Sequence, residues 1–181
     1  MLLEGCLIAA HTAQAKASFI YVNHDYNEER KNLEQALAQV KAKGLMGKNI
    51  LGTGVDLEIE LFTGMGSYVA GEETAMLESM QGRPAMPRQK PPFYPTDFGL
   101  YGKPTLVNNV ETLCNIPRII HKGAGWFTQV GTEKCPGTML FSLSGAVNKP
   151  GVYELPMGTP LRTLIDEGGG GVPGGRKVKA G

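Results

Sequence analysis

The sequence has few of the residues that mark several classes of protein. Its 181 residues include three cysteines and one tryptophan, and 18 basic and 17 acidic residues leave a net charge of +1. Cys6, Cys114 and Cys135 are odd in number and far apart, without a Cys-x-x-Cys spacing, so they indicate neither a disulfide framework nor a self-contained metal site. Each is expected to be a small core residue. The balanced charge gives no field that would attract nucleic acid or an anionic membrane.

Long apolar runs are also missing. No stretch reaches the roughly 20 apolar residues that a membrane helix needs, and the N-terminal Met-Leu-Leu-Glu lacks the basic start of a signal peptide. Hydrophobic residues still make up 41% of the chain, which is enough to bury a core. The composition favours a globular protein of one or two domains, with the cytoplasm as the expected location.

The first third of the sequence alternates between helix and strand patterns. Apolar spacing indicates helices over 1–17 and 27–44, the second capped by Asn27. The continuous apolar run at 18–22 indicates a strand that is buried on both faces. Residues 55–61 alternate apolar and acidic side chains, so this second strand has one face in water. Together they predict a βαβ unit, with ligands bound beyond the carboxyl ends of its strands.

A glycine-rich turn at 64–71 follows the second strand, and Glu72 and Glu73 then open a helix. Its three glycines remove side chains where a ligand or another piece of backbone approaches closely. The two carboxylates would repel an anion, but they would accept hydrogen bonds from ribose hydroxyls or from the N–H edge of a heterocycle. The alternative is that they are ordinary helix-start residues. Neighbouring helical positions diverge by about 100°, so the two are not expected to act on one atom, which argues against a paired-carboxylate hydrolase.

Residues 83–104 contain six prolines, too many for a helix or a central strand. This long loop also carries cations and aromatic rings: Arg83, Arg88, Lys90, Phe93, Tyr94, Phe98 and Tyr101. A ring on a proline-stiffened loop could stack on a base, or the rings could anchor the loop to the core. Residues 105–107 indicate a short strand. Asn108 or Asn109 then caps a helix from Val110, and the other amide is available to a ligand.

A second unit is predicted from residue 135 onward. Strand patterns at 139–143 and 152–155 flank a turn and predict a hairpin, and Thr159 is positioned to cap a short helix. Residues 176–179 indicate the start of one more strand. A hairpin, a helix and a strand is the order of a small β-grasp domain. The predicted domains are therefore 1–134 and 135–181, in the α/β class.

Several ordered motifs, taken together, resemble one protein family. They are Gly71-Glu72-Glu73-Thr74, Lys90-Pro91-Pro92-Phe93, Gly102-Lys103-Pro104-Thr105, Val107-Asn108-Asn109-Val110-Glu111-Thr112-Leu113 and Pro150-Gly151-Val152-Tyr153-Glu154. The sequence resembles the NADH-binding, FMN-containing flavoprotein subunit of respiratory complex I. The same module is found in NAD-linked hydrogenases and formate dehydrogenases, so those relatives are the alternative within this class.

The resemblance implies a Rossmann-like flavin domain, incomplete at its N-terminus, followed by a partial ubiquitin-like β-grasp domain of the SLBB type. In this family NADH passes a hydride to FMN, and electrons then leave singly to iron–sulfur clusters toward quinone, without a side-chain acid or base. The resemblance also assigns the site residues. Those expected to border FMN are Tyr68, Gly71, Glu72, Glu73, Asn108 and Asn109, and those expected to bind NADH are Lys90 and Phe93.

The implied partners are the [2Fe–2S] subunit and the larger iron–sulfur subunit of an electron-transfer complex, at the cytoplasmic side of the inner membrane. The sequence also departs from the family. The family's FMN-phosphate glycine loop would precede residue 1, and the four cysteines of its C-terminal [4Fe–4S] bundle are not in this sequence. Ala70 stands where the family usually has Cys, and 23–25 is shorter than the usual loop.

These departures predict an internal fragment of the flavoprotein. On its own the chain is expected to bind FMN weakly or not at all and to lack NADH oxidation. Quenching of flavin fluorescence by micromolar protein, followed by reduction with NADH, would contradict this expectation. The alternative of another class is a non-catalytic scaffold that binds a partner or a small ligand.

Overall fold

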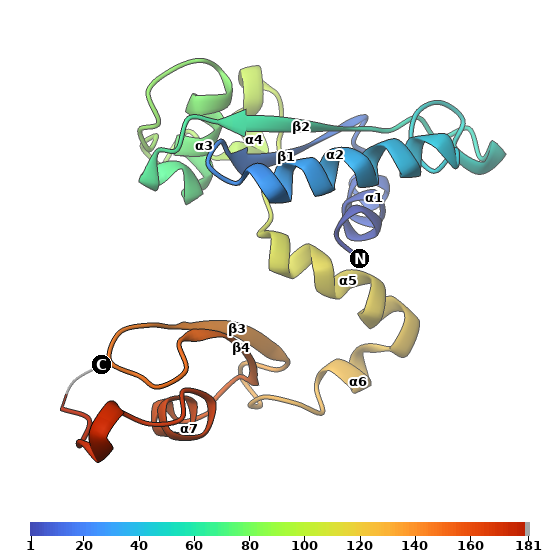
Figure 1. Cartoon of the computed structure of the whole chain (residues 1–181). Coiled ribbons are helices and arrows are strands. Elements are labelled where there is room, and N and C mark those ends of the chain that lie inside the picture. Colours follow the sequence, from blue (N-terminus) through green and yellow to red (C-terminus); the bar gives the residue numbers. More distant parts are fainter. Residues whose placement is uncertain (180–181) are drawn as a thin grey trace. The chain divides into compact units, whose positions relative to one another are not determined.

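The computed structural model describes residues 1–179, which form two compact units that divide between Pro117 and Arg118 (Figure 1). The elements of the first unit are α1 (Leu2–Thr12), β1 (Ala17–Asn23), α2 (Asn27–Ala42), β2 (Glu58–Gly64), α3 (Glu73–Met80) and α4 (Pro95–Phe98), and α5 (Val110–Lys122) crosses the division. No helix among the described residues is long and apolar enough to span a membrane.

The predicted βαβ unit is confirmed. β1 and β2 pair in parallel from Ala17 opposite Glu58 to Asn23 opposite Gly64, and α2 connects them. β2 begins later than predicted, because the Val55 carbonyl accepts a hydrogen bond from Ile50 in the preceding turn. The strand predicted at 105–107 is wrong: these residues form no strand, and the Thr105 N–H bonds to the Pro95 carbonyl instead.

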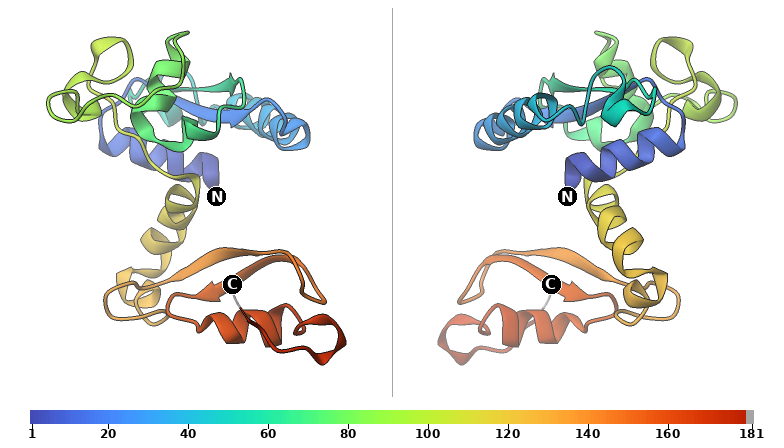
Figure 2. Two further views of the ribbon diagram at one scale, coloured as in Figure 1. Left: turned by 90° about the vertical axis from the view of Figure 1, so that its left-hand side faces the viewer. Right: turned by 90° about the vertical axis from the view of Figure 1, so that its right-hand side faces the viewer.

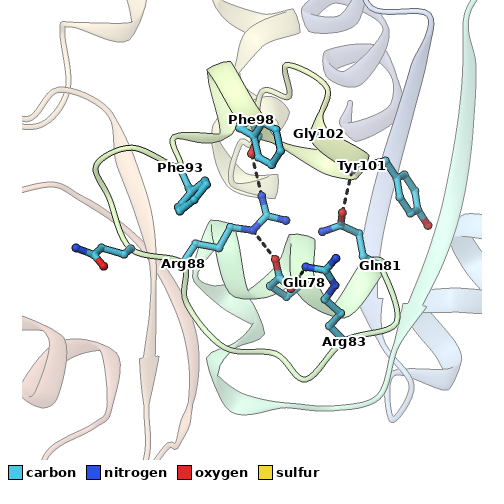
Figure 3. Close-up of a pocket in the computed structure, with 9 residues that line it drawn as sticks. Glu78, Gln81, Arg83, Arg88, Phe93, Phe98, Tyr101 and Gly102 are labelled. Atoms are coloured by element: carbon cyan, nitrogen blue, oxygen red, sulfur yellow. Dashed lines mark hydrogen bonds and ion pairs between the residues drawn. The ribbon is translucent and has the colours of Figure 1, made fainter.

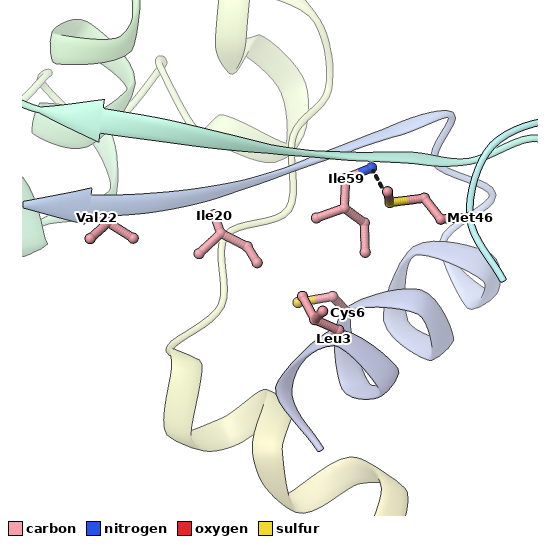
Figure 4. Packing of buried hydrophobic residues seen from close by; sticks show 6 residues of the cluster. All are labelled: Leu3, Cys6, Ile20, Val22, Met46 and Ile59. Carbon is pink, nitrogen blue, oxygen red and sulfur yellow. Dashed lines mark hydrogen bonds between the residues drawn. The ribbon is translucent and has the colours of Figure 1, made fainter. Parts of the chain in front are cut away.

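The core of the first unit lies on one face of this two-stranded sheet (Figure 4). Its buried side chains come from α1, both strands and the segment before β2: Leu3, Cys6, Ile20, Val22, Met46 and Ile59. The apolar stripe of α2, with Leu33, Leu37 and Val40, packs against them. The apolar side chains that recur at helical spacing on α1 and α2 therefore pack against those that alternate along β1, on one face of the sheet.

The opposite face of β1 is only partly covered, so the prediction of a strand buried on both faces is wrong. Phe19 is 41% exposed. Tyr21 stacks on Phe62 with 5.6 Å between ring centroids, and its hydroxyl lies 3.0 Å from Ser79 Oγ on α3. Hence α3 covers this face through a tyrosine contact near the strand ends.

Two further local predictions need correction. Asn27 does not cap α2, because the N-cap position is Tyr26 and Asn27 is already the first helical residue, where its Oδ1 accepts a hydrogen bond from Arg30 Nη2. Among the cysteines, Cys6 is buried as predicted and Cys114 is half-buried, but Cys135 is exposed. A cysteine in a loop outside the periodic segments carries no burial signal, and its placement depended on tertiary packing.

The second unit contains α6 (Ala124–Phe127), β3 (Thr138–Leu143), β4 (Gly151–Pro156) and α7 (Leu161–Thr163), which continues into a π-helical turn, Leu164–Gly168. The strands form the predicted antiparallel hairpin. The hairpin lies alongside the α7 segment (Figure 2), where a Cβ on Gly169 would sit 2.6 Å from Leu143 Cδ2.

Two predictions in the second unit are wrong. Thr159 does not cap the short helix, because the N-cap position is Pro160 and the Thr159 hydroxyl donates to the Pro156 carbonyl. Residues 176–179 are described but form no strand, and Arg176 Nε donates to the Pro173 carbonyl in the turn just before. Both side chains make local turn contacts, which compete with regular structure.

Candidate functional site

The glycine turn lies at the carboxyl end of β2, and two of its glycines make room for the protein's own side chains. A Cβ on Gly64 would lie 2.0 Å from the hydroxyl oxygen of Tyr21, and one on Gly66, where φ is +82°, would lie 2.8 Å from His24 Cε1. Gly71 differs, because nothing lies within 4 Å of its Cβ position. Tyr68, which begins the 3₁₀ turn Tyr68–Gly71, is fully exposed. This end of the turn presents an open surface.

Glu72 is the N-cap of α3. Its Oε2 accepts hydrogen bonds from the Ala75 N–H at 2.8 Å and from the Thr74 hydroxyl at 2.5 Å. The carboxylate thereby satisfies one of the free N–H groups at the helix start. The prediction of an ordinary helix-start residue is therefore correct for Glu72, and it leaves the second carboxylate oxygen available to another donor.

The prediction that Glu72 and Glu73 cannot act on one atom is wrong. Lys90 Nζ lies 3.2 Å from Glu72 Oε1 and 2.8 Å from Glu73 Oε1. The 100° argument fails because Glu72 has an extended conformation, with φ −75° and ψ 131°, and so precedes the helix instead of occupying it. One ammonium from a distant loop thus bridges both carboxylates.

These contacts shift the proton equilibria of the group. Burial alone would raise the pKa of Glu72, but hydrogen bonds from Thr74, Ala75 and Lys90, together with the Lys90 charge, hold that pKa below its usual value. Hydrogen bonds to Glu73 and Glu72 raise the pKa of Lys90. Glu72 and Lys90 are therefore both ionised at neutral pH.

We expect part of the acid sensitivity of the chain to come from Glu72. Because its pKa is lower in the folded state, its stabilising contribution is complete above the unfolded-state value near 4.5 and is lost as pH falls through the folded-state value. Urea unfolding of Glu72→Gln should lose less stability between pH 7 and acidic pH than the parent does. Glu34→Gln, on the exposed surface of α2, is the control. Identical pH dependence for all three proteins would contradict this role.

An open hollow of about 570 Å³ lies beside α3 (Figure 3). It is lined by Glu78, Gln81, Arg83, Arg88, Gln89, Phe93, Phe98, Tyr101 and Gly102. Phe93 is 43% exposed, and its ring centroid lies 6.0 Å from that of Phe98. Aromatic faces and paired charges in one hollow suit a planar polar ligand.

Both the Nε and the Nη1 of Arg88 are engaged by the protein. Its Nε lies 2.5 Å from Glu78 Oε1, and its Nη1 donates to the carbonyls of Phe98 and Gly99 at 2.8 and 3.3 Å. The guanidinium lies between Glu78 and Phe98 (Figure 3). The three loop cations singled out in the sequence, Arg83, Arg88 and Lys90, are thus all paired with carboxylates of α3 or its N-cap.

The predicted site residues fall into three groups. Contacts join Glu72, Glu73 and Lys90, and Tyr68 and Gly71 immediately precede them. Phe93 belongs to the adjoining hollow. Asn108 and Asn109 are exposed ahead of α5, where Asn109 Oδ1 accepts a hydrogen bond from the Glu111 N–H at 2.8 Å and so caps that helix. No contact described for residues 1–179 joins the asparagines to the carboxylates.

Sequence reasoning missed Thr74 and Glu78. Thr74 is completely buried, and its hydroxyl accepts from the Arg88 N–H at 2.8 Å while donating to Glu72. Glu78 pairs with Arg83 and Arg88. The available signal for Glu78 was an acidic residue on a helix that precedes a basic loop. The sequence spacing does not predict which cation of that loop pairs with it. No three residues among His, Cys, Asp and Glu cluster as metal ligands within 1–179.

Comparison with known proteins places this geometry in a family. Residues 1–118 match the Nuo51 FMN-binding domain, and residues 140–181 match the SLBB domain. The chain is 47% identical over 180 residues to the F subunit of NADH-quinone oxidoreductase from Escherichia coli (strain K12). It is 48% identical over 180 residues to the F subunit from Aquifex aeolicus, and 46% identical over 179 residues to an F subunit from Rhizobium meliloti.

These alignments cover 99% of this chain but only 40–42% of each relative. The chain also resembles the crystal structure of an NAD⁺-reducing [NiFe]-hydrogenase, with a TM-score of 0.80 and 36% identity over 91% of this chain and 27% of that one. The predicted α/β fold class, with a flavin domain followed by an SLBB-type domain, is confirmed. The chain belongs to the Nuo51 FMN-binding domain family and continues into an SLBB domain.

Proposed function

We propose that this chain forms part of an NADH-oxidising flavoprotein subunit, in which it supplies one side of the FMN and NADH pocket. The observation that carries the proposal is the convergence of Glu72, Glu73 and Lys90 beside an exposed glycine turn at the carboxyl end of β2. Ligands of parallel α/β units bind at this edge. The identity of 46–48% to NADH-quinone oxidoreductase F subunits supports the same function.

The residues present fit the ring of FMN. Gly71 has open space at its Cβ position, the side chain of Tyr68 is fully exposed, and that of Glu73 is 40% exposed. A planar ring can approach such a turn closely, and a carboxylate accepts hydrogen bonds from the ring's N–H edge. We propose that Tyr68, Gly71, Glu72 and Glu73 hold this edge.

The two asparagines complete the proposed FMN residues. Asn109 uses its Oδ1 to cap α5, while Asn108, just before it, is exposed and carries a second amide. Bound FMN would supply the hydride acceptor and the one-electron steps, so the chain needs no acid or base of its own. The tasks left to these residues are binding the ring, orienting it and excluding water.

We propose that NADH lies over Lys90 and Phe93. The Phe93 ring is exposed on the hollow, where it can stack on a base, and the Lys90 ammonium can donate to ribose or phosphate oxygens while neutralising Glu72 and Glu73. A cationic donor between two carboxylates and an aromatic face suits a dinucleotide, which has both anionic and planar parts.

A chimera tests the proposal. Residues 1–181 replace the matching segment of the Escherichia coli F subunit in the assembled enzyme, and FMN content and NADH oxidation with an artificial one-electron acceptor are measured. We expect FMN to be retained and kcat/KM to stay within about tenfold of the parent, which is about 1.4 kcal/mol. A chimera that assembles without FMN, or that contains FMN and does not oxidise NADH, would overturn the proposal and favour a non-catalytic scaffold.

The chimera also separates the two redox alternatives. The 36% identity to an NAD⁺-reducing hydrogenase keeps a hydrogenase subunit as the second candidate, with a formate dehydrogenase subunit beside it. We propose NADH:quinone oxidation first, since identity to the F subunits is higher over more of the chain. Failure to assemble with the quinone-reducing enzyme, together with assembly into the hydrogenase, would reverse this order.

The proposed partners are the [2Fe–2S] subunit and the larger iron–sulfur subunit, with the complex at the cytoplasmic side of the inner membrane.

We also propose the predicted domain limits, 1–134 and 135–181. The SLBB match from residue 140 and the hairpin that begins at Thr138 support the second domain.

A further inference from the structure

The loop at 83–94 carries the two proposed NADH residues, Lys90 and Phe93, but residues 83–94 contain neither helix nor strand. Its backbone–backbone hydrogen bonds are short-range, such as the bond from the Phe93 N–H to the Gln89 carbonyl. A loop of this kind keeps its position only through contacts with the elements around it. Arg88 provides several of these contacts.

Arg88 joins three places in the first unit. Its backbone N–H donates to Thr74 Oγ1 at the start of α3, its Nε pairs with Glu78 further along α3, and its Nη1 reaches the carbonyls at the end of α4. The side chains of Arg88 and Glu78 are only 12% and 13% exposed. Charge-assisted bonds that are largely shielded from water are strong, and without Arg88 the largely buried Glu78 carboxylate would be left with Arg83 alone, whose Nη1 lies 3.4 Å away.

Thr74 connects this anchor to the carboxylates. Its fully buried hydroxyl accepts from the Arg88 N–H and donates to Glu72 Oε2, whose other oxygen lies 3.2 Å from Lys90 Nζ. The loop is therefore tied to the start of α3 at residue 88 and again at residue 90. A displacement of Arg88 would move both Lys90 and the face of Phe93.

We propose that Arg88 is a positioning residue that, through Glu78 and Thr74, holds Lys90 and Phe93 in the geometry that binds NADH. This inference rests on the proposed function. Arg88 uses its backbone N–H, its Nε and its Nη1 in contacts with the protein, and through these contacts it acts on the loop. Its loss should weaken NADH binding more than turnover, because none of the residues proposed to hold FMN lies on this loop.

The kinetic test uses the chimera with Arg88→Met, which keeps the aliphatic length and removes every side-chain donor. We expect KM for NADH to rise by about tenfold, with kcat and FMN content within about twofold. Arg88→Lys keeps the charge without the planar fork and should give an intermediate KM. Lys103→Met removes one exposed cation nearby and serves as the control. Parallel loss of kcat, FMN and NADH affinity in Arg88→Met, or an unchanged KM, would overturn the proposal.

A second measurement does not depend on activity. Hydrogen–deuterium exchange of residues 84–94 in the 181-residue chain should be faster by about tenfold in Arg88→Met than in the parent or in Lys103→Met, because the side-chain bonds to Glu78 and to the carbonyls at the end of α4 are lost and only the backbone bond to Thr74 remains. Unchanged exchange would overturn the anchoring whatever the kinetics show. A parent chimera that does not oxidise NADH would overturn the proposed function, and with it the role of this loop in NADH binding.

Discussion

Phe93→Ala in the chimera is expected to raise the KM for NADH by about 10- to 100-fold while leaving FMN content unchanged. Stacking of a base on an aromatic ring contributes about 1–3 kcal/mol, and each 1.4 kcal/mol corresponds to a factor of ten. The Phe93 ring is 43% exposed on the hollow, so its loss leaves little cavity in the protein. Steady-state kinetics with NADH, together with flavin absorbance, measures both quantities.

The neighbouring aromatic residue is the matched control for this experiment. Tyr94 is 45% exposed but does not line the hollow. Tyr94→Ala removes a ring of similar size from the next position and should change KM by less than about threefold. Equal losses of NADH and FMN in Phe93→Ala would mean that the ring only packs the loop against Phe98.

Leu77→Ala is expected to lower the free energy of unfolding by about 2–5 kcal/mol. Leu77 is 1% exposed on α3, between completely buried Thr74 and buried Met80. Removing its branched end leaves a cavity that the surrounding side chains fill only in part. Because α3 also carries Glu73 and Glu78, the contacts of these carboxylates with Lys90 and Arg88 should weaken when α3 is destabilised.

The stability change is measured by urea unfolding followed by circular dichroism. Leu106→Ala makes the same chemical deletion at a position that is 64% exposed, and it should cost less than about 1 kcal/mol. A lower urea midpoint, with the dependence of the unfolding free energy on urea concentration unchanged, would show that the folded state is destabilised. Equal destabilisation by the two variants would show that burial of Leu77 does not support the unit.

Local patterns account for a large part of this fold. The apolar spacing of α2, the alternation around Ile59 in β2 and the hairpin β3–β4 all follow from side chains that repeat at the period of their element. The failures lie where polar side chains choose among local partners, as at Asn27 and Thr159. Such choices differ by little free energy, so composition alone does not decide them.

The motifs from Gly71 to Asn109 also identified the candidate site residues without a structure, because these motifs are those of the family. How the residues meet depended on the tertiary fold. Glu72 precedes α3 as its N-cap, and its carboxylate and that of Glu73 both contact Lys90. Arg88 of the irregular loop pairs with Glu78 on α3. These pairs lie 10 to 18 residues apart in a stretch without periodicity, where no local rule sets the distance between side chains. Burial against α3 and the satisfaction of charged groups set it instead.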